Sequence, residues 1–244
     1  MIDLHTHILP GLDDGPRTLE ESLCIVALLA DLGFDHIFLT PHFRQGFFES
    51  SPSSVREASQ QLRVALGNRL PAVRFSEAHE VHIGSVFDSH GRVNGFLRLG
   101  SKQPDILLEL PRQPFPFELL SRTIDRLFFE GIRVVLAHPE KHPELSADPA
   151  RYRGLCERGV KLQLNITSLA GFAGRQARRA AEYLCTEGMV HAMGTDTHSL
   201  AHAVEYVPKG MRRALKLLGE KRLRVITEGS ELNLDSLGET HTWS

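Results

Sequence analysis

Two short motifs in the sequence have the spacing of paired metal ligands. His5 and His7 flank a single threonine near the N-terminus, and Asp196 and His198 flank another threonine late in the chain. Side chains two residues apart on a β-strand point to the same side, so each pair could hold one cation. A single pair with this spacing is as often two surface residues as a metal site. The interpretation therefore depends on the other candidate ligands in the chain.

Five further candidate ligands lie at predicted strand ends or in the loops that follow them: Asp14, His42, Glu80, Glu109 and His138. In a parallel α/β barrel the carboxyl ends of the strands share one face, so such residues converge. Histidine and carboxylate without sulfur suit Mn²⁺, Zn²⁺ or iron. At three or four ligands per ion with one shared carboxylate, the set predicts two or three ions. Clustered divalent cations are suited to phosphoryl transfer.

Phosphate chemistry also needs fixed positive charge near these ligands. Arg44 follows His42 by two residues, and Lys141 follows His138 by three. We interpret both as candidate catalytic and phosphate-binding residues, against the alternative of solvated surface charges. Phe47 and Phe48 share the loop of Arg44 and could flank an aromatic substrate ring, or simply pack the loop.

Asp13 allows two interpretations. It could be a metal ligand beside Asp14, or it could form a turn before the helix for which Thr18 is an alternative cap. The remaining histidines are interpreted as structural or solvated, and His79 is expected to point away from its neighbour Glu80. These residues are His36, His79, His82, His90, His142, His191, His202 and His241.

Other phosphatase and nucleotide chemistries are excluded by missing motifs. A cysteine phosphatase needs an arginine six residues after its thiolate, and none of Cys24, Cys156 and Cys185 has one. The sequence also has no G-x-S-x-G elbow and no phosphate-binding G-x-x-x-x-G-K-[ST] loop. Three scattered cysteines argue against a disulfide framework.

Short apolar runs alternate with stretches of helical apolar spacing along the chain. The predicted strands are Ile2–Leu4, His36–Thr40, Val73–Ser76, Asp105–Leu110, Arg133–Ala137, Lys161–Leu164 and Val190–Met193. The predicted helices are Leu19–Ala30, Val55–Leu66, Leu119–Phe128, Ala177–Leu184 and Ala203–Leu218. Seven βα units without a dividing linker predict one domain over residues 1–244, folded as a closed or nearly closed α/β barrel. The tail after Glu228 is expected to be peripheral.

The composition is that of an ordinary globular protein. The chain has 244 residues, 41% of them hydrophobic, and a formal net charge of −2. This balance argues against a nucleic-acid partner, and no apolar stretch reaches the ~20 residues of a bilayer span. The N-terminus lacks the pattern of a signal peptide, so a cytoplasmic location is expected.

The motifs resemble those of the PHP (polymerase and histidinol phosphatase) superfamily over residues 2 to about 226. Within it they are most similar to the manganese-dependent tyrosine-protein phosphatases of bacterial capsule and exopolysaccharide operons. The matching segments, in order, are Ile2–Pro16 with its Asp-Asp-Gly-Pro element, Glu20–Ser22, Thr40–Arg44, Glu80, Leu108–Leu110, Ala137–Glu140 and Thr195–His198.

The resemblance implies a distorted TIM-like (β/α)₇ barrel, the PHP fold, with three divalent ions, Mn²⁺ before iron or Zn²⁺. One ion would use His5, His7, Glu80 and Asp196, a second would use Glu80, Glu109 and His138, and a third would use Asp14, His42 and His198. The implied substrate is phosphotyrosine on the tail of a bacterial tyrosine kinase that drives polysaccharide export. Homo-oligomers are an open alternative to a monomer.

Two departures from the family pattern leave rival functions open. Lys141 stands where the family often has arginine, and an arginine expected after the Asp-x-His motif is replaced within Leu200–Ala203. The rivals are a phosphoesterase of the same superfamily acting on a small metabolite such as histidinol phosphate, and a catalytically silent scaffold that binds a kinase. An amidohydrolase-type barrel ranks lower, because strand four carries Glu109 and strand six ends at Asn165.

Overall fold

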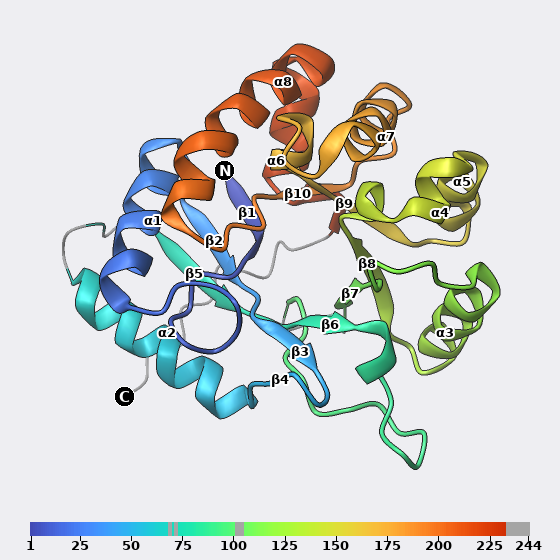
Figure 1. Cartoon of the computed structure of the whole chain (residues 1–244), viewed down its shortest axis with the longest axis horizontal. Helices are drawn as coiled ribbons and strands as arrows, with labels where there is room; N and C mark the ends of the chain where they lie inside the picture. The colour runs from blue at the N-terminus through green and yellow to red at the C-terminus, as the bar shows by residue number, and fades with distance from the viewer. Residues whose placement is uncertain (68–69, 71–72, 101–104, 233–244) are drawn as a thin grey trace.

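The structure is a computed structural model that describes residues 1–67, 70, 73–100 and 105–232. Its strands surround the centre and its helices form an outer layer (Figure 1). The strands are β1 (Ile2–Thr6), β2 (His36–Leu39), β3 (His42–Arg44), β4 (Phe48–Glu49), β5 (Arg74–Glu77), β6 (Glu80–His82), β7 (Asp105–Glu109), β8 (Arg133–Ala137), β9 (Lys161–Asn165) and β10 (Ala192–Gly194).

The strands close into a distorted barrel with seven strand positions, called staves below. Parallel pairing runs β1–β2–β5 in one sheet and β10–β9–β8–β7–β6–β3 in the other, and β4 adds an antiparallel hairpin to β3. Two staves are each broken by a short irregular segment, between β2 and β3 and between β5 and β6. The first and last staves are joined by backbone hydrogen bonds, from the N–H of Asp196 to His5 (2.8 Å) and from the N–H of His7 to Thr197 (3.0 Å).

The seam between the first and last staves depends on a glycine. A Cβ atom on Gly194 would lie 2.5 Å from the Cβ of His5 and 2.9 Å from its backbone nitrogen. Only a residue without a side chain lets β10 approach β1 this closely. The buried carboxylate of Asp3 adds to the seam, because it accepts hydrogen bonds from the N–H (2.9 Å) and the hydroxyl (2.7 Å) of Thr195.

The helices that cover the barrel are α1 (Leu19–Asp31), α2 (Pro52–Leu66), α3 (Phe117–Phe129), α4 (Pro143–Ala147), α5 (Ala150–Glu157), α6 (Ile166–Leu169), α7 (Gly174–Thr186) and α8 (Leu200–Thr227). Three short 3₁₀ turns are η1 (Ile83–Ser85), η2 (Pro139–Lys141) and η3 (Ser230–Leu232). Helix α8 packs beside α1, α6 and α7. No helix in the described part of the chain is both long and apolar enough to cross a bilayer.

All seven predicted strands and five predicted helices are present, with shifted ends. The predicted run Val73–Ser76 is one part of a longer stave that continues into β6, and β3 continues the stave of β2. Helices α4, α5 and α6 were not predicted, because each is too short for a helical apolar repeat to stand out. The predicted stop at Gly219 is confirmed by its φ of 71°, but helical structure resumes beyond it.

Two apolar clusters hold the barrel together. The larger lies between strands and helices, as in other barrels of alternating strands and helices. The smaller takes side chains mainly from successive strands, with Leu4, Phe38, Leu107 and Val135 among its members, and it includes Leu232 of η3, which is 2% exposed. The tail residues 233–244, with His241, lie outside the described residues.

Candidate metal centre

The nine candidate ligands, although far apart in sequence, come together at the carboxyl ends of the strands. Among the described residues, four groups of histidine and carboxylate side chains have ligand atoms within 4.8 Å of one another. The groups are His5–His7–Asp196, His5–Glu80–His138, His42–Glu80–Glu109 and His7–Asp14–His42–His198. Together these groups contain the nine residues and no others.

The innermost group is built on the end of β1. Nε2 of His5 lies 2.9 Å from Nε2 of His7, and both side chains are fully buried. Oδ1 of Asp196 lies 3.6 Å from the first nitrogen and 3.4 Å from the second. The two histidines face the same way because they are two residues apart along an extended chain, as the sequence predicts.

The Asp196 motif reaches this group by a different geometry from the one expected. Strand β10 ends at Gly194, and Asp196 has a left-handed backbone with a φ of 52°. His138 is also left-handed, with a φ of 30°, and among the described residues these are the two non-glycine positions with positive φ. Such backbone strain of about 1–3 kcal/mol per residue is typical of functional sites. The expectation of plain strand alternation at Asp196 is therefore wrong.

Glu80 lies at the centre of the cluster and belongs to two of the four ligand groups. Its Oε1 lies 2.8 Å from Nε2 of His138, while its Oε2 lies 2.9 Å from Nδ1 of His42. The same Oε2 is 3.3 Å from the Nε2 atoms of both His5 and His7. Oε2 of Glu109, at the end of β7, lies 3.7 Å from Nδ1 of His42.

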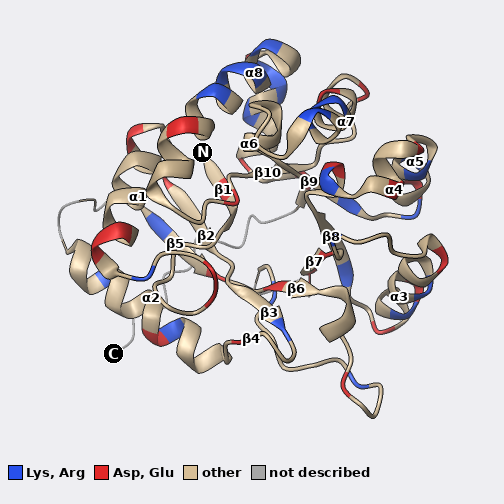
Figure 2. Ribbon diagram, in the orientation of Figure 1, with Lys and Arg blue, Asp and Glu red and all other residues tan. Residues whose placement is uncertain are grey.

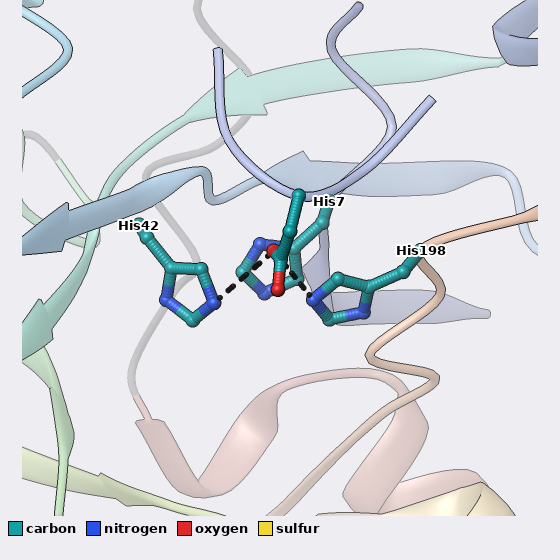
Figure 3. Close-up of side chains that lie close together, drawn as sticks. His7, His42 and His198 are labelled. Atoms are coloured by element: carbon teal, nitrogen blue, oxygen red, sulfur yellow. Dashed lines mark ion pairs between the residues drawn. The ribbon is translucent and has the colours of Figure 1, made fainter. Parts of the chain in front are cut away.

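The outermost group surrounds Asp14, in the loop after β1. Oδ1 of Asp14 lies 3.5 Å from Nε2 of His42 and 3.2 Å from Nε2 of His198. The rings of His7, His42 and His198 are arranged around this carboxylate (Figure 3). The His7 and His198 rings stack with centroids 4.0 Å apart.

Four buried or partly buried groups fix the orientation of the candidate ligands. Asp13 accepts from Nδ1 of His7 (2.7 Å), from the N–H of His42 (3.0 Å) and from the N–H of Gly15 (3.0 Å). Its carboxylate therefore both forms the predicted turn and orients a ligand ring from behind, which is a common support for metal-bound histidine.

The other three supports surround His5 and Asp196. Oε1 of Gln163 lies 2.9 Å from Nδ1 of His5. Oδ2 of Asp196 accepts from Nδ2 of Asn165 (2.8 Å) and from the ammonium of Lys141. Gln163 and Asn165 lie on β9, and sequence reasoning missed their roles. Their place at a strand end, in line with the other candidates, is the signal that could have identified them.

The buried charges influence one another strongly. Burial disfavours the ionised form of Asp196, but the Lys141 ammonium and the surrounding histidines together outweigh it and hold the pKa of Asp196 well below its usual range. Burial and the negative charge of Glu80 raise the pKa of Glu109 to about 7. Burial and the nearby Lys141 lower the pKa of His138 to about 4. Ionised carboxylates and neutral imidazoles are the forms that bind metal.

The cluster fits divalent cations on its own chemistry. Oε2 of Glu80 is buried and has no hydrogen-bond partner among the described residues, although three ring nitrogens surround it. Two ring nitrogens of His5 and His7 also face each other at 2.9 Å. Converging lone pairs without protons between them are costly in a buried site unless a cation binds them. A set of imidazole and carboxylate ligands suits Mn²⁺, Zn²⁺ or iron.

The cluster opens into a surface cavity whose empty volume, counted together with the open space at its mouth, is about 430 Å³. Its lining includes six of the sequence-predicted site residues: His42, Glu109, His138, Lys141, Asp196 and His198. It also includes Arg112, which follows β7 by three residues and was not singled out from the sequence. Many of the other Lys and Arg residues belong to the outer helices, with several of them on α8 (Figure 2).

The predicted substrate contacts on the β3–β4 hairpin lie beside this cavity rather than in its lining. The guanidinium of Arg44 lies 4.3 Å from the ring centroid of Phe47, which is 71% exposed. Phe48 stacks on the ring of His42 with centroids 5.5 Å apart. His79 contacts Ser50 and the backbone of Leu97 and does not join the cluster.

Comparisons with known proteins agree with this arrangement. Tyrosine-protein phosphatase YwqE of Bacillus subtilis is 29% identical over 96% of this chain and 91% of its own length. Tyrosine-protein phosphatase CpsB of Streptococcus pneumoniae is 25% identical over 92% of this chain and 93% of its own. A crystal structure from work on YwqE and CpsB, described as unique metal-dependent tyrosine phosphatases, matches with a TM-score of 0.81 and 26% identity. That match covers 97% of this chain and 95% of the other.

The sequence profile of a capsular polysaccharide synthesis family, CpsB/CapC, matches residues 1–231, which is nearly all of the barrel and its ligand motifs. The chain belongs to the CpsB/CapC family of capsular polysaccharide synthesis proteins.

Proposed function

We propose that this protein is a metal-dependent phosphomonoesterase that hydrolyses phosphotyrosine in proteins. The observation that carries the proposal is the gathering of nine histidine and carboxylate side chains in four overlapping groups, with five of the nine side chains lining one cavity. Relatives along nearly the whole chain are named tyrosine-protein phosphatases, which favours this substrate over other phosphate esters.

Three divalent ions, with Mn²⁺ the best candidate, fit the four groups of ligand atoms. His5, His7, Glu80 and Asp196 would hold one ion, and Glu80, Glu109 and His138 a second. Asp14, His42 and His198 would hold the third ion. His7 also belongs to this last group, which supports a third ion lying close to the first. When bound, the ions supply positive charge that polarises the phosphoryl group and acidifies a water nucleophile.

The side chains of the protein position the ester and the charges around it. Asp196 and His198 act as ligands, and Asn165 and Lys141 hold Asp196 in place. Lys141 also lines the cavity, so its ammonium can face phosphoryl oxygens. Arg44 is proposed as a second anion contact, from the hairpin at the rim. Phe47 and Phe48 on that hairpin would contact the aromatic ring of the substrate.

The proposed substrate protein is a bacterial tyrosine kinase that regulates capsule or exopolysaccharide synthesis, phosphorylated on its tail. Membership of a capsular polysaccharide synthesis family supports the pathway. We propose that the encounter takes place in the cytoplasm, where protein kinases have access to ATP. The three cysteines are free, which fits a reducing compartment.

The test is an assay of purified protein with measured metal content. A phosphotyrosine peptide, histidinol phosphate and sugar phosphates are compared as substrates, with Asp196→Ala as the inactive reference. We expect the highest kcat/KM on the peptide and loss of turnover in the variant. Preference for histidinol phosphate would indicate a small-metabolite enzyme, and no release of phosphate from any aryl ester by metal-loaded protein would indicate a scaffold.

A further inference from the structure

Three cationic side chains, Lys141, Arg44 and Arg112, lie in or beside the cavity, and they differ in what they contact. The ammonium of Lys141 donates to Oδ2 of Asp196, so part of its charge is used to stabilise that carboxylate. The guanidinium of Arg44 lies against the ring of Phe47 on the hairpin. A cation in the cavity lining without such a contact would add to what Lys141 and Arg44 can offer a phosphate dianion.

Arg112 is that cation on geometric grounds. It lines the same cavity as Glu109, His138 and Asp196, on the wall formed by the loop between β7 and α3. Its side chain has no hydrogen bond or ion pair to any of the residues that the structure describes, although acidic side chains share the cavity. An exposed arginine at the mouth of a pocket, without an acid to neutralise it, is available to an anionic ligand.

The local sequence limits the movement of this loop. Leu110 is 6% exposed and anchors the loop in the core, and Pro111, Pro114 and Pro116 surround Arg112 in the chain. Each proline fixes its own φ and restricts the residue before it. The backbone on both sides of Arg112 is thereby restricted, and binding costs less conformational entropy than it would in a flexible loop.

We propose that Arg112 binds the phosphoryl oxygens of the substrate and thereby contributes to its affinity and specificity. This inference rests on the proposed phosphomonoesterase function. A guanidinium offers two parallel N–H donors to a phosphate, whereas an ammonium offers a point charge. Arg112 thus supplies the planar, two-pronged contact that Lys141 does not. Because the contact is to the phosphoryl group, it acts on every phosphomonoester and not only on peptides.

The test compares Arg112→Ala and Arg112→Lys with a matched control, Arg122→Ala, in which an exposed arginine on α3 is removed. The measurements are KM and kcat on p-nitrophenyl phosphate and on a phosphotyrosine peptide, the inhibition constant of inorganic phosphate, and metal content. We expect Arg112→Ala to raise KM on both substrates and the phosphate inhibition constant about tenfold, the usual worth of one charge-assisted hydrogen bond. The lysine variant should recover part of this loss, and metal content should not change.

Equal constants for Arg112→Ala and Arg122→Ala in an active wild type overturn the inference while the proposed function stands. A defect confined to the peptide also overturns it, because Arg112 would then contact the residues around phosphotyrosine. Calorimetry of metal-loaded protein with inorganic phosphate separates the two proposals. If the wild type turns over none of the esters but Arg112→Ala binds phosphate about tenfold more weakly, the inference stands and the proposed function fails.

Discussion

Nε2 of His5 and Nε2 of His7 lie 2.9 Å apart, and both side chains are fully buried. At this separation the two nitrogens can share one proton, but two protons between them would repel each other. The carboxylate oxygens of Glu80 and Asp196 lie 3.3–3.6 Å from the same nitrogens. A divalent cation among these atoms satisfies all of them, so this pair of histidines links metal binding to the stability of the fold.

Metal removal should therefore lower thermal stability. A ligand at 100 times its Kd stabilises the folded state by about 2.7 kcal/mol, which corresponds to roughly 5–10 °C in Tm for a chain of this size. We expect at least that decrease when the protein is treated with a chelator, and recovery when Mn²⁺ is added. Differential scanning calorimetry measures both.

His5→Ala should abolish turnover and most of the Mn²⁺-dependent rise in Tm, because it removes a ligand shared by two groups. The matched control is His90→Ala, which removes an exposed histidine. A His5→Ala protein with wild-type activity and the full Mn²⁺ effect would refute the ligand assignment.

Asp13→Asn should weaken metal binding without removing a ligand. Asp13 accepts hydrogen bonds from the ring of His7 and from the backbone of His42, and an amide cannot reproduce the charge that orients the ring. Loss of such a support typically costs 10- to 100-fold in metal affinity. Titration of the apoprotein with Mn²⁺ measures the effect, with Asp31→Asn on the exposed face of α1 as control. Unchanged affinity would mean that Asp13 has only its turn-forming role.

Arg44→Ala should raise KM for aryl phosphates more than it lowers kcat. Arg44 lies on the hairpin beside the cavity and outside the ligand groups, so its loss should weaken substrate binding and leave the metals in place. The expected rise is about tenfold, if one charge-assisted hydrogen bond is lost. Steady-state kinetics beside Arg56→Ala, an exposed position on α2, distinguishes this from a general charge effect. A fall in kcat with KM unchanged would contradict a binding role.

His36→Gln should reduce the loss of stability at acid pH. Burial and the Arg74 guanidinium lower the pKa of His36 to about 4 from 6.5 in the unfolded chain, and Asp35 only partly opposes them. The unfolded state therefore binds the proton first, so stability is complete above pH 6.5 and falls as pH decreases from 6.5 to 4. The effect of this one group reaches up to about 3 kcal/mol.

Glutamine was chosen because it can keep the hydrogen bond that Nε2 of His36 makes with Ser76 (2.9 Å). Urea unfolding of both proteins at pH 7, 5.5 and 4.5 measures the difference. We expect the stability of the variant relative to the wild type to increase toward low pH. Parallel pH profiles would show that His36 does not titrate in this way.

The chemistry of the candidate ligands and the order of the elements follow from the amino-acid sequence alone. Each strand is a short apolar run that must be buried, and the residues that follow it are set by chain connectivity. For that reason the sequence alone predicts that His5, His42, Glu109 and His138 lie on one face of the barrel. The alternation of strands and helices likewise predicted a barrel, since few other folds bury so many parallel strands.

Contacts between two polar residues that are distant in the chain follow from the three-dimensional fold and not from any sequence pattern. No periodicity predicts that Lys141 donates to Asp196, that Asn165 supports the same carboxylate, or that Asp196 adopts a left-handed backbone. Nothing in the sequence distinguishes Arg112 from other loop arginines, and its place in the cavity wall follows from the fold. Apolar burial leaves a repeating pattern in the sequence, whereas a polar contact depends on how two staves are placed relative to each other, which the whole barrel determines.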